Sequence, residues 1–186
     1  SIGTISVSSP GIRTGKDELF IREWVEVSLK DTHFTAESYL ALSDSKYKWY
    51  PVTRGGEFRK WYGNLSNVLH LGNNAAKIIN EGVDYRLREK EHYFKQGITW
   101  TMISSYSPSF RVVPQGIAFG NGGPTLFIND QLFYLGVLNS KLARNLLLIL
   151  NPTMNCTKSD IEKLPIFEKG NKSLQVSHFV SASISI

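Results

Sequence analysis

The stretch from Gly97 to Ile128 constrains the fold of this 186-residue sequence more than any other. Four short runs rich in β-branched and aromatic residues follow one another there, reading GITWTMISS, SFRVV, GIAFG and TLFI. Segments containing glycine or proline separate them. Strand-forming runs bounded by such residues are typical of β-hairpins. The stretch therefore predicts a mostly antiparallel sheet.

Helical patterns lie on both sides of this stretch. Residues 73–96 predict a helical segment that is broken near Gly82. Residues 130–150 form the most apolar part of the chain, with leucines near helical spacing. Asn139 and Ser140 interrupt this segment, and we expect them to cap a second helix within it.

Two further segments decide the fold class. Residues 19–27, LFIREWVEV, alternate as a strand does. TKSDIEKLPI carries capping-box spacing from Ser159 to Glu162, and it predicts a short helix that ends before Pro165. Strands and helices thus follow one another without β–α–β alternation. This order predicts an α+β fold with flanking helices, and it argues against a doubly wound nucleotide-binding fold.

The stretch from Lys46 to Tyr62, KYKWYPVTRGGEFRKWY, is the strongest candidate for a binding surface. Five cationic side chains against Glu57 leave a net charge of +4, which is most of the formal +5 of the chain. Glycine lets a backbone approach a ligand closely, and arginine binds phosphate through two parallel hydrogen bonds. We therefore predict DNA contacts, to phosphates or in a groove, from Lys48, Arg54, Gly55, Gly56, Arg59, Lys60 and Tyr62.

The aromatic residues of this stretch have a second interpretation. Large rings most often lie in a core, so Trp49, Phe58 and Trp61 are predicted to form a buried frame behind the cations. Thr99 and Arg111 form a weaker candidate surface for reading bases, and the alternative there is a plain sheet edge.

Catalytic motifs are absent or degenerate. GIRTGK has three residues between its glycines where a phosphate-binding loop has four, and Asp17 follows the lysine where that loop has serine or threonine. FGNGGPT and NPTM resemble the cofactor turn and the adenine motif of methyltransferases only in part, and they favour a hairpin turn and a helix stop. Cys156 and the four histidines show no metal-ligand spacing. We expect no catalytic, cofactor or metal site within the chain.

Simple sequence features predict a cytoplasmic protein without a membrane partner. A single cysteine excludes a disulfide framework, and no window approaches the ~20 apolar residues that a membrane-spanning helix needs. Because the sequence begins with Ser1 inside a strand-like run, we also expect it to be part of a longer protein.

Several motifs in order resemble one family. GIRTGKDELFIREWVEV, KWYPVTRGGEFRKWYGN, REKEHYFKQGITWTMISS, FRVVPQGIAF, LGVLNSKLARNLLLILNPTMN and SDIEKLPI are similar to the C-terminal part of adenine-specific DNA methyltransferases of BREX phage-defence systems and of related type II restriction-modification enzymes. The likeness runs from about Gly11 to Pro165. The end of the sequence also resembles target-recognition domains of type I specificity subunits and the TaqI-like specificity domain.

This resemblance implies a division of labour. A catalytic domain upstream in the same chain would bind S-adenosylmethionine, and residues 1–168 would form a target-recognition domain that reads double-stranded DNA. That domain would have a curved, mostly antiparallel sheet, and residues 169–186 would be a linker or the start of the next segment. Other subunits of the defence system are expected partners.

Two alternatives stay open. Residues 132–150 could dock another protein, which would make the chain an interaction module. Asp44 and Lys46 supply an Asp-x-Lys fragment, which would suit a Mg²⁺-dependent nuclease.

Overall fold

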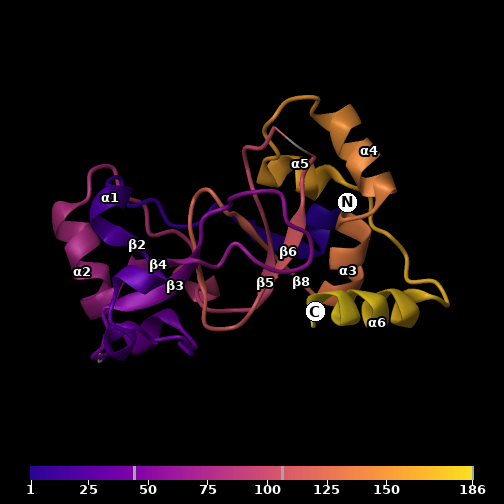
Figure 1. Ribbon diagram of the computed structural model, residues 1–186. Coiled ribbons are helices and arrows are strands. Elements are labelled where there is room, and N and C mark those ends of the chain that lie inside the picture. The colour runs from indigo at the N-terminus through magenta and orange to yellow at the C-terminus, as the bar shows by residue number, and fades with distance from the viewer. Residues whose placement is uncertain (44, 106, 186) are drawn as a thin grey trace.

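The computed structural model describes residues 1–43, 45–105 and 107–185, and they form two four-stranded sheets with flanking helices (Figure 1). The strands are β1 (Ser6–Ser9), β2 (Ile21–Glu23), β3 (Trp49–Thr53), β4 (Asn67–His70), β5 (Gly97–Trp100), β6 (Phe110–Val113), β7 (Ala118–Phe119) and β8 (Thr125–Ile128). The helices are α1 (Asp17–Phe20), α2 (Gly72–Glu81), α3 (Gln131–Leu138), α4 (Lys141–Leu150), α5 (Lys158–Lys163) and α6 (Ser173–Ile184).

Strand pairing is mostly antiparallel. The first sheet has the order β1-β8-β5-β6, and all of its pairs are antiparallel. The second sheet has the order β2-β4-β3-β7, in which only β3 and β7 run parallel. The α+β class and the mostly antiparallel pairing are confirmed. The strands are divided between two sheets, however, where the sequence suggested one.

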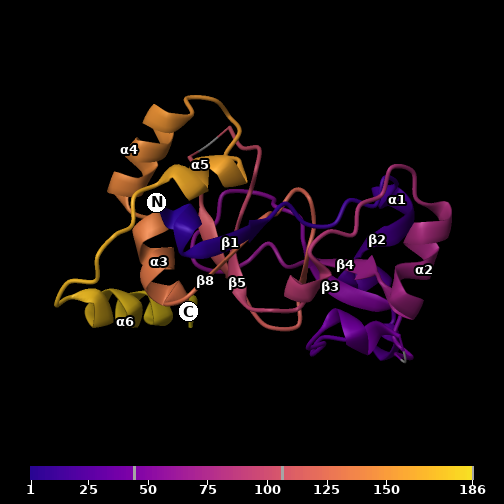
Figure 2. The same cartoon turned by 180° about the vertical axis from the view of Figure 1, so that it is seen from behind.

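The chain passes back and forth between the two sheets. After β1 in the first sheet it forms β2, β3 and β4 in the second, returns for β5 and β6, contributes β7 to the second and ends with β8 in the first. Figures 1 and 2 show the sheets as the centres of two lobes joined by these crossings. Neither sheet consists of one continuous stretch of chain, so the lobes are not independent units of sequence.

Each sheet has its own apolar core. Trp100, Phe110 and Leu126 are fully buried in the core of the first sheet. Tyr50 and Phe119 are fully buried in the core of the second. Burial of such side chains is the main favourable contribution to folding.

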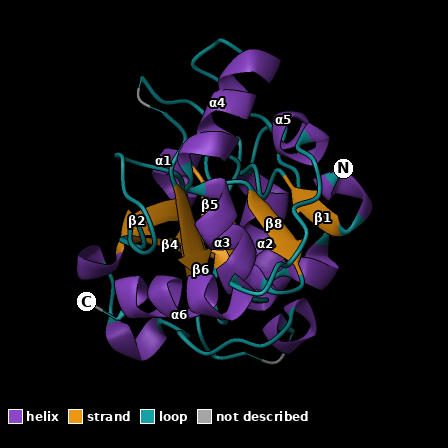
Figure 3. Ribbon diagram, turned by 90° about the vertical axis from the view of Figure 1, so that its right-hand side faces the viewer, coloured by secondary structure: helices purple, strands orange, loops and turns teal. Residues whose placement is uncertain are grey.

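The helices of the first lobe pack in layers. Helix α3 contacts β5, β6 and β8, and α6 packs against α3 (Figure 3). The two helices approach closely at Gly136, where a Cβ atom would lie 2.7 Å from a methyl group of Val176. Residues 173–184 thus pack on the first lobe, and the domain boundary at residue 168 stays a prediction.

No single helix in the described part of the chain is long and apolar enough to cross a bilayer. Only α3 and α4 taken together reach that length and composition, and the chain bends by 67° between them.

Most of the predicted elements are present. The four β-rich runs contain β5, β6, β7 and β8. Of the helical segment expected over residues 73–96, α2 forms the first part and ends just before Gly82, whereas the second part is wrong, because only the 3₁₀ turn Lys90–His92 is helical there. The apolar segment is split into α3 and α4 as expected, because the Ser140 hydroxyl accepts a hydrogen bond from the Ala143 N–H. This bond satisfies one of the free N–H groups at the start of α4.

Two further details of the prediction are wrong. The strand expected over residues 19–27 is limited to β2, because the chain turns into a 3₁₀ helix at Trp24–Glu26. The capping box of α5 is formed by Thr157 and Asp160, not by Ser159 and Glu162. The helix begins two residues earlier than that spacing suggested.

Candidate nucleic-acid interface

The stretch from residue 46 to residue 62 connects the two sheets. It begins with β3 in the second sheet, and it reaches the first sheet at Trp61. There the Trp61 N–H donates to the Phe110 carbonyl at 3.0 Å, and the Val112 N–H donates to the Trp61 carbonyl at 2.8 Å. Residues 54–60 therefore form a crossing loop that is fixed to a sheet at both ends.

The glycines of the crossing loop allow it to pack on a second glycine-rich turn, residues 120–123. Gly55 has φ +87°, and a Cβ atom there would lie 2.6 Å from the Gly122 carbonyl oxygen. Just before the loop, the Thr53 hydroxyl donates to the Gly123 carbonyl at 3.0 Å. A side chain at residue 55 would therefore be strained by its backbone and would collide with the turn.

Three backbone carbonyls hold the crossing loop in place. The Gly56 carbonyl accepts from the Thr101 hydroxyl at 3.0 Å, and the Glu57 carbonyl accepts from the Asn64 side chain at 2.9 Å. The Arg59 carbonyl accepts from the Arg111 guanidinium at 3.3 Å. These bonds fix the backbone of the loop to the rest of the fold, while the side chains of residues 57–60 lie at the surface.

Arg111 is buried behind this loop, with 1% of its surface exposed. Besides Arg59, its guanidinium reaches the Ser109 carbonyl and hydroxyl and the Thr101 hydroxyl, the last at 3.2 Å. Among the described residues it has no carboxylate partner, and its Nε has no acceptor. Burial, together with the neighbouring charge of Arg59, lowers the pKa of Arg111 to about 10. The guanidinium acts as a support for the loop.

Thr99 is also buried, with 2% of its surface exposed, and its hydroxyl donates to the Pro124 carbonyl. It is paired with Arg111 across β5 and β6. In this conformation neither side chain can reach the edge of a base, because both are covered by protein. Their role in reading bases stays a prediction.

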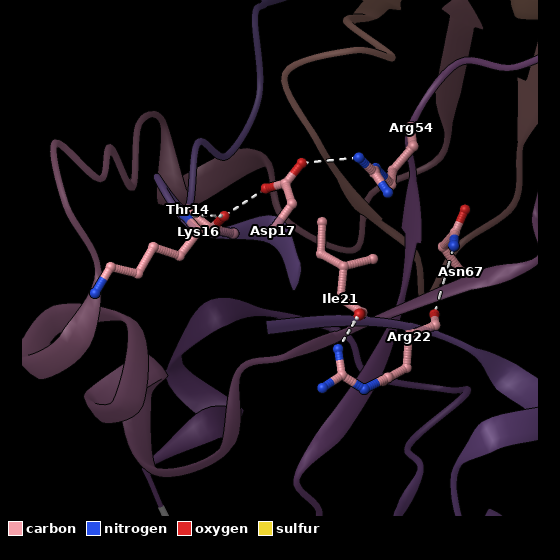
Figure 4. Close-up of polar contacts among 7 residues, drawn as sticks. All are labelled: Thr14, Lys16, Asp17, Ile21, Arg22, Arg54 and Asn67. Atoms are coloured by element: carbon pink, nitrogen blue, oxygen red, sulfur yellow. Dashed lines mark hydrogen bonds and ion pairs between the residues drawn. The ribbon is translucent and has the colours of Figure 1, made fainter. Parts of the chain in front are cut away.

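The predicted cations differ in their surroundings. Arg54 forms an ion pair with Asp17 at 2.8 Å, and the Asp17 carboxylate also accepts from the Thr14 hydroxyl (Figure 4). Lys60 donates to the Asn139 carbonyl at 3.0 Å. Arg59 is exposed and forms no ion pair with any described residue.

The charged stretch is not a single patch. Lys48 precedes β3 and lies 3.9 Å from Asp31, whereas Arg54 follows the same strand. A strand rises by roughly 3.3 Å per residue, so the length of β3 separates the two side chains. The cations near the crossing loop are Arg54, Arg59 and Lys60.

The aromatic residues are divided between core and surface. Trp61 is half-buried against the first core, and Trp49 is half-buried with its ring edge-on to that of His70, the centroids 5.1 Å apart. The prediction that Phe58 is buried is wrong, because 46% of its surface is exposed. Tyr62 is exposed to a similar extent, 49%.

Three hollows share lining residues, and the first two are lined in part by the crossing loop. The first, of about 420 Å³, is lined by Arg13, Asp17, Arg54 and Asn121, and it ends at Ile103. The second, of about 750 Å³, shares Ile103 and continues through Gly56, Glu57, Phe58, Ser104 and Ser105. The third, of about 260 Å³, shares the two serines and ends against α4 and residues 151–156. Neighbouring hollows share Ile103 or the two serines, and we refer to the three together as the concave strip. A further hollow, of about 400 Å³, also lies against the loop, at residues 54–57.

The motifs rejected on sequence have structural roles here. FGNGGPT runs from the last residue of β7 through the turn to the first residue of β8, and NPTM follows the end of α4. The Asn151 side chain accepts from Thr153 and donates to Asp160 at 2.9 Å, so its polar groups close the turn after the helix. Asp44, which the nuclease alternative requires, lies outside the described residues. Within the described part of the chain, no three His, Cys, Asp or Glu side chains gather as metal ligands would.

Comparison with known proteins places the chain among methyltransferase sequences. No protein-family model matches it. It is 33% identical over 177 residues to the adenine-specific methyltransferase BrxX of Escherichia coli O9:H4 (strain HS), an alignment that covers 92% of this chain and 14% of that protein. It is 34% identical over 185 residues to the adenine-specific methyltransferase PglX of Lacticaseibacillus casei (strain Zhang), covering 94% of this chain and 15% of that protein. The chain spans about one seventh of the length of these relatives. It is therefore related, along nearly its whole length, to one segment of each of these adenine-specific methyltransferases.

Proposed function

We propose that this chain is the DNA sequence-recognition domain of an N6-adenine-specific DNA methyltransferase of a BREX-type phage-defence system, and that it is not catalytic by itself. The observation that carries the proposal is the exposure of Arg54 and Arg59 on a fixed loop beside a concave strip, in a chain related to adenine-specific methyltransferases. Fixed cations beside a groove are typical of surfaces that bind the DNA backbone.

Arg54 and Arg59 are the proposed phosphate contacts. The ion pair between Arg54 and Asp17 is half-exposed, and such pairs stabilise a protein by only about 0–1 kcal/mol. A DNA phosphate can therefore take the place of Asp17 at little cost. Arg59 forms no ion pair with a described residue, so no partner has to be replaced when it binds a phosphate. Lys60, bound to the Asn139 carbonyl, has a smaller part in DNA binding.

Base reading is assigned to polar side chains that line the strip. Asn121 and Ser105 are exposed there, and amide and hydroxyl groups can donate to and accept from base edges. Asp17, once released by Arg54, can accept a hydrogen bond from the amino group of cytosine. In this proposal Arg111, Thr101 and Gly55 keep the crossing loop in position.

The catalytic steps belong to another part of the same protein. That part would bind S-adenosylmethionine and receive the flipped adenine, since an enzyme can reach a base only outside the stack. The domain proposed here would hold the duplex in register for that step. Double-stranded DNA, the methyltransferase domain and other subunits of the defence system are the proposed partners, and the cytoplasm is the proposed location.

The salt dependence of DNA binding tests this function. The complete natural protein that carries this chain is titrated with duplex DNA at several salt concentrations, with and without the double substitution Arg54→Ala, Arg59→Ala. Each lost phosphate contact lowers the slope of log K against log salt by about 0.9, so the double variant should lose up to about 1.8 units. The matched control is Arg88→Ala with Arg144→Ala, because both arginines are exposed and neither lines the strip. An unchanged slope in the first variant would contradict the assignment.

One observation favours a second candidate function, that of a protein-interaction module. Leu142 and Ile149 lie seven positions apart on α4, on one face of the helix, and they are 57% and 78% exposed. A stable protein complex formed by the complete protein, without any DNA binding, would support this function over the first. The nuclease alternative predicts Mg²⁺-dependent cleavage that Asp44→Ala abolishes.

A further inference from the structure

Two large apolar side chains lie exposed in the concave strip. Phe58, on the crossing loop, is 46% exposed, and Ile103, on the segment after β5, is 61% exposed. Both line the same hollow of about 750 Å³, together with Gly56, Glu57 and two serines. The apolar pair thus faces a space large enough for another molecule.

The backbone on both sides of this hollow is fixed. Around Phe58, the carbonyls of Gly56, Glu57 and Arg59 all accept hydrogen bonds from side chains elsewhere in the fold. A fixed loop loses little conformational entropy when it binds, so an exposed ring on it is already arranged for contact.

Ile103 is held in a similar way. It forms an isolated antiparallel bridge with Asn155. On its two sides, the Ser104 N–H donates to the Met154 carbonyl at 3.0 Å, and the Met102 carbonyl accepts from the Cys156 N–H at 2.7 Å. The backbone that carries each of the two apolar side chains is therefore fixed.

The surroundings of the pair are polar and contain two arginines. Arg54 lines the adjoining hollow that shares Ile103, where it is paired with Asp17, and Arg59 directly follows Phe58 on the loop. Glu57 and two serines line the hollow of the pair itself. Apolar side chains with arginines nearby suit a partner in which flat apolar faces lie between negatively charged groups. Stacked nucleobases between phosphate backbones have this character.

We propose that Phe58 and Ile103 form a wedge that enters the DNA duplex between adjacent base pairs and unstacks them. The wedge rests on the proposed function, and it is the way in which the concave strip would deform the bound DNA. Proteins that insert apolar side chains in this way kink the duplex, and the unstacking costs a few kcal/mol per step. The step that the wedge opens is separate from the adenine that the catalytic domain receives.

Binding to mismatched DNA tests the wedge. A mismatched pair is already partly unstacked, so a protein that opens a particular step binds more tightly when that step carries a mismatch. The complete natural protein is titrated with duplexes that contain its methylated site and one mismatch at each position in turn. We expect tighter binding at two places, the target adenine and one other step, by about tenfold or more at each.

Substitution of the two residues should affect only the second place. The double variant Phe58→Ala, Ile103→Ala should lose the mismatch preference at that step and keep it at the target adenine. Phe58→Trp should keep both preferences, because a larger ring can still enter the stack. The matched control is Phe179→Ala with Leu174→Ala on α6, whose side chains are 70% and 83% exposed outside the strip, and it should keep both.

The outcomes separate the wedge from the proposed function. Two results would overturn the wedge. In one, the unmodified protein shows no mismatch preference away from the target adenine. In the other, it shows that preference and the double variant keeps it. If the unmodified protein still binds duplex DNA with the salt dependence assigned to Arg54 and Arg59, the proposed function stands without the wedge. If it does not bind duplex DNA at all, both fail.

Discussion

At the scale of single residues, Arg111 shows how a charge can support a binding loop without touching the ligand. Its guanidinium donates to the Arg59 carbonyl and to the Thr101 hydroxyl, which in turn donates to the Gly56 carbonyl. One side chain therefore contacts the crossing loop both directly and through Thr101. The cost of burying this cation is offset only by neutral acceptors, so its stabilising effect on the fold is small.

This arrangement predicts that Arg111→Met weakens DNA binding more than it destabilises the fold. Methionine can fill much of the same space without a buried charge, so the desolvation cost that it removes offsets much of the loss of hydrogen bonds to neutral acceptors. We expect the melting temperature to stay within about 4 °C, which corresponds to about 1 kcal/mol for a domain of this size. Affinity for duplex DNA should fall by about tenfold, equal to about 1.4 kcal/mol, because the Arg59 carbonyl loses its donor.

Hydrogen exchange separates positioning from general damage in this variant. Amide exchange in residues 56–60 should become faster, while the amides of β5 and β6 keep their protection. Arg111→Lys should behave like Arg111→Met in this measurement, since an ammonium group does not reproduce the planar fork of guanidinium donors. Protection lost throughout the first sheet would show that Arg111 holds the fold itself.

The sequence predicted the residue types of this site better than their exposure. Arg54 and Arg59 are at the surface as a phosphate contact requires, and Trp49 and Trp61 are partly buried. Phe58 was expected in the core, because large rings usually lie there. The three carbonyls that hold its loop at the surface bond to Asn64, Thr101 and Arg111, and sequence spacing gives no information about such distant partners.

At the scale of elements, the crossing loop depends on contact between two glycine-rich segments. Gly55 needs both a left-handed backbone and room for the Gly122 carbonyl. Gly122 is equally restricted, since a Cβ atom there would lie 2.4 Å from the Arg54 carbonyl oxygen. From sequence, the Gly55-Gly56 pair is expected to let the backbone approach a ligand closely. In the structure, Gly55 allows two turns to pack closely.

Substitution of Gly55 by alanine should therefore destabilise the chain. A left-handed backbone costs a residue with a Cβ atom about 1–2 kcal/mol, and the collision with Gly122 adds to this. We expect a loss of about 2 kcal/mol or more in the free energy of unfolding, measured by urea denaturation of the 186-residue chain. Gly170→Ala is the matched control, because a Cβ atom there would meet nothing within 4 Å beyond its neighbours in the chain, and it should change stability little. Equal stability of the two variants would show that the two turns can separate without cost.

Element prediction succeeded where the signal was local. The split between α3 and α4 follows from the Ser140 cap, and the four short strands follow from their turns. It failed at residues 24–27, where the alternating pattern continues but the backbone turns. Within that segment Trp24 and Val25 are 48% and 64% exposed, so no core contact keeps it extended. An alternating pattern predicts a strand only when a neighbouring strand is present to pair with it.

At the scale of the whole molecule, the repeated crossings make the two lobes depend on each other. The connection from β3 to β4 carries the crossing loop to the first sheet and back, and β7 lies between two strands of the first sheet in the sequence. The sequence could not predict this exchange, because strands of the two sheets have the same local pattern. Which strands pair is decided by contacts between residues far apart in the chain.

This connectivity predicts that the two cores unfold together. Leu126 is fully buried in the first core and Leu69 is 1% exposed in the second, so replacing either by alanine should cost about 2–5 kcal/mol. In a cooperative unit, each substitution lowers the stability of both lobes by the same amount. Hydrogen exchange under mild denaturant measures this directly, because amides of β8 and β4 report on one lobe each. Leu69→Ala should accelerate exchange in β8 as much as in β4. Leu126→Ala should likewise accelerate exchange in β4 as much as in β8. A loss of protection confined to the substituted lobe would show that the crossings do not couple them, and that the crossing loop lies between two parts that can open separately.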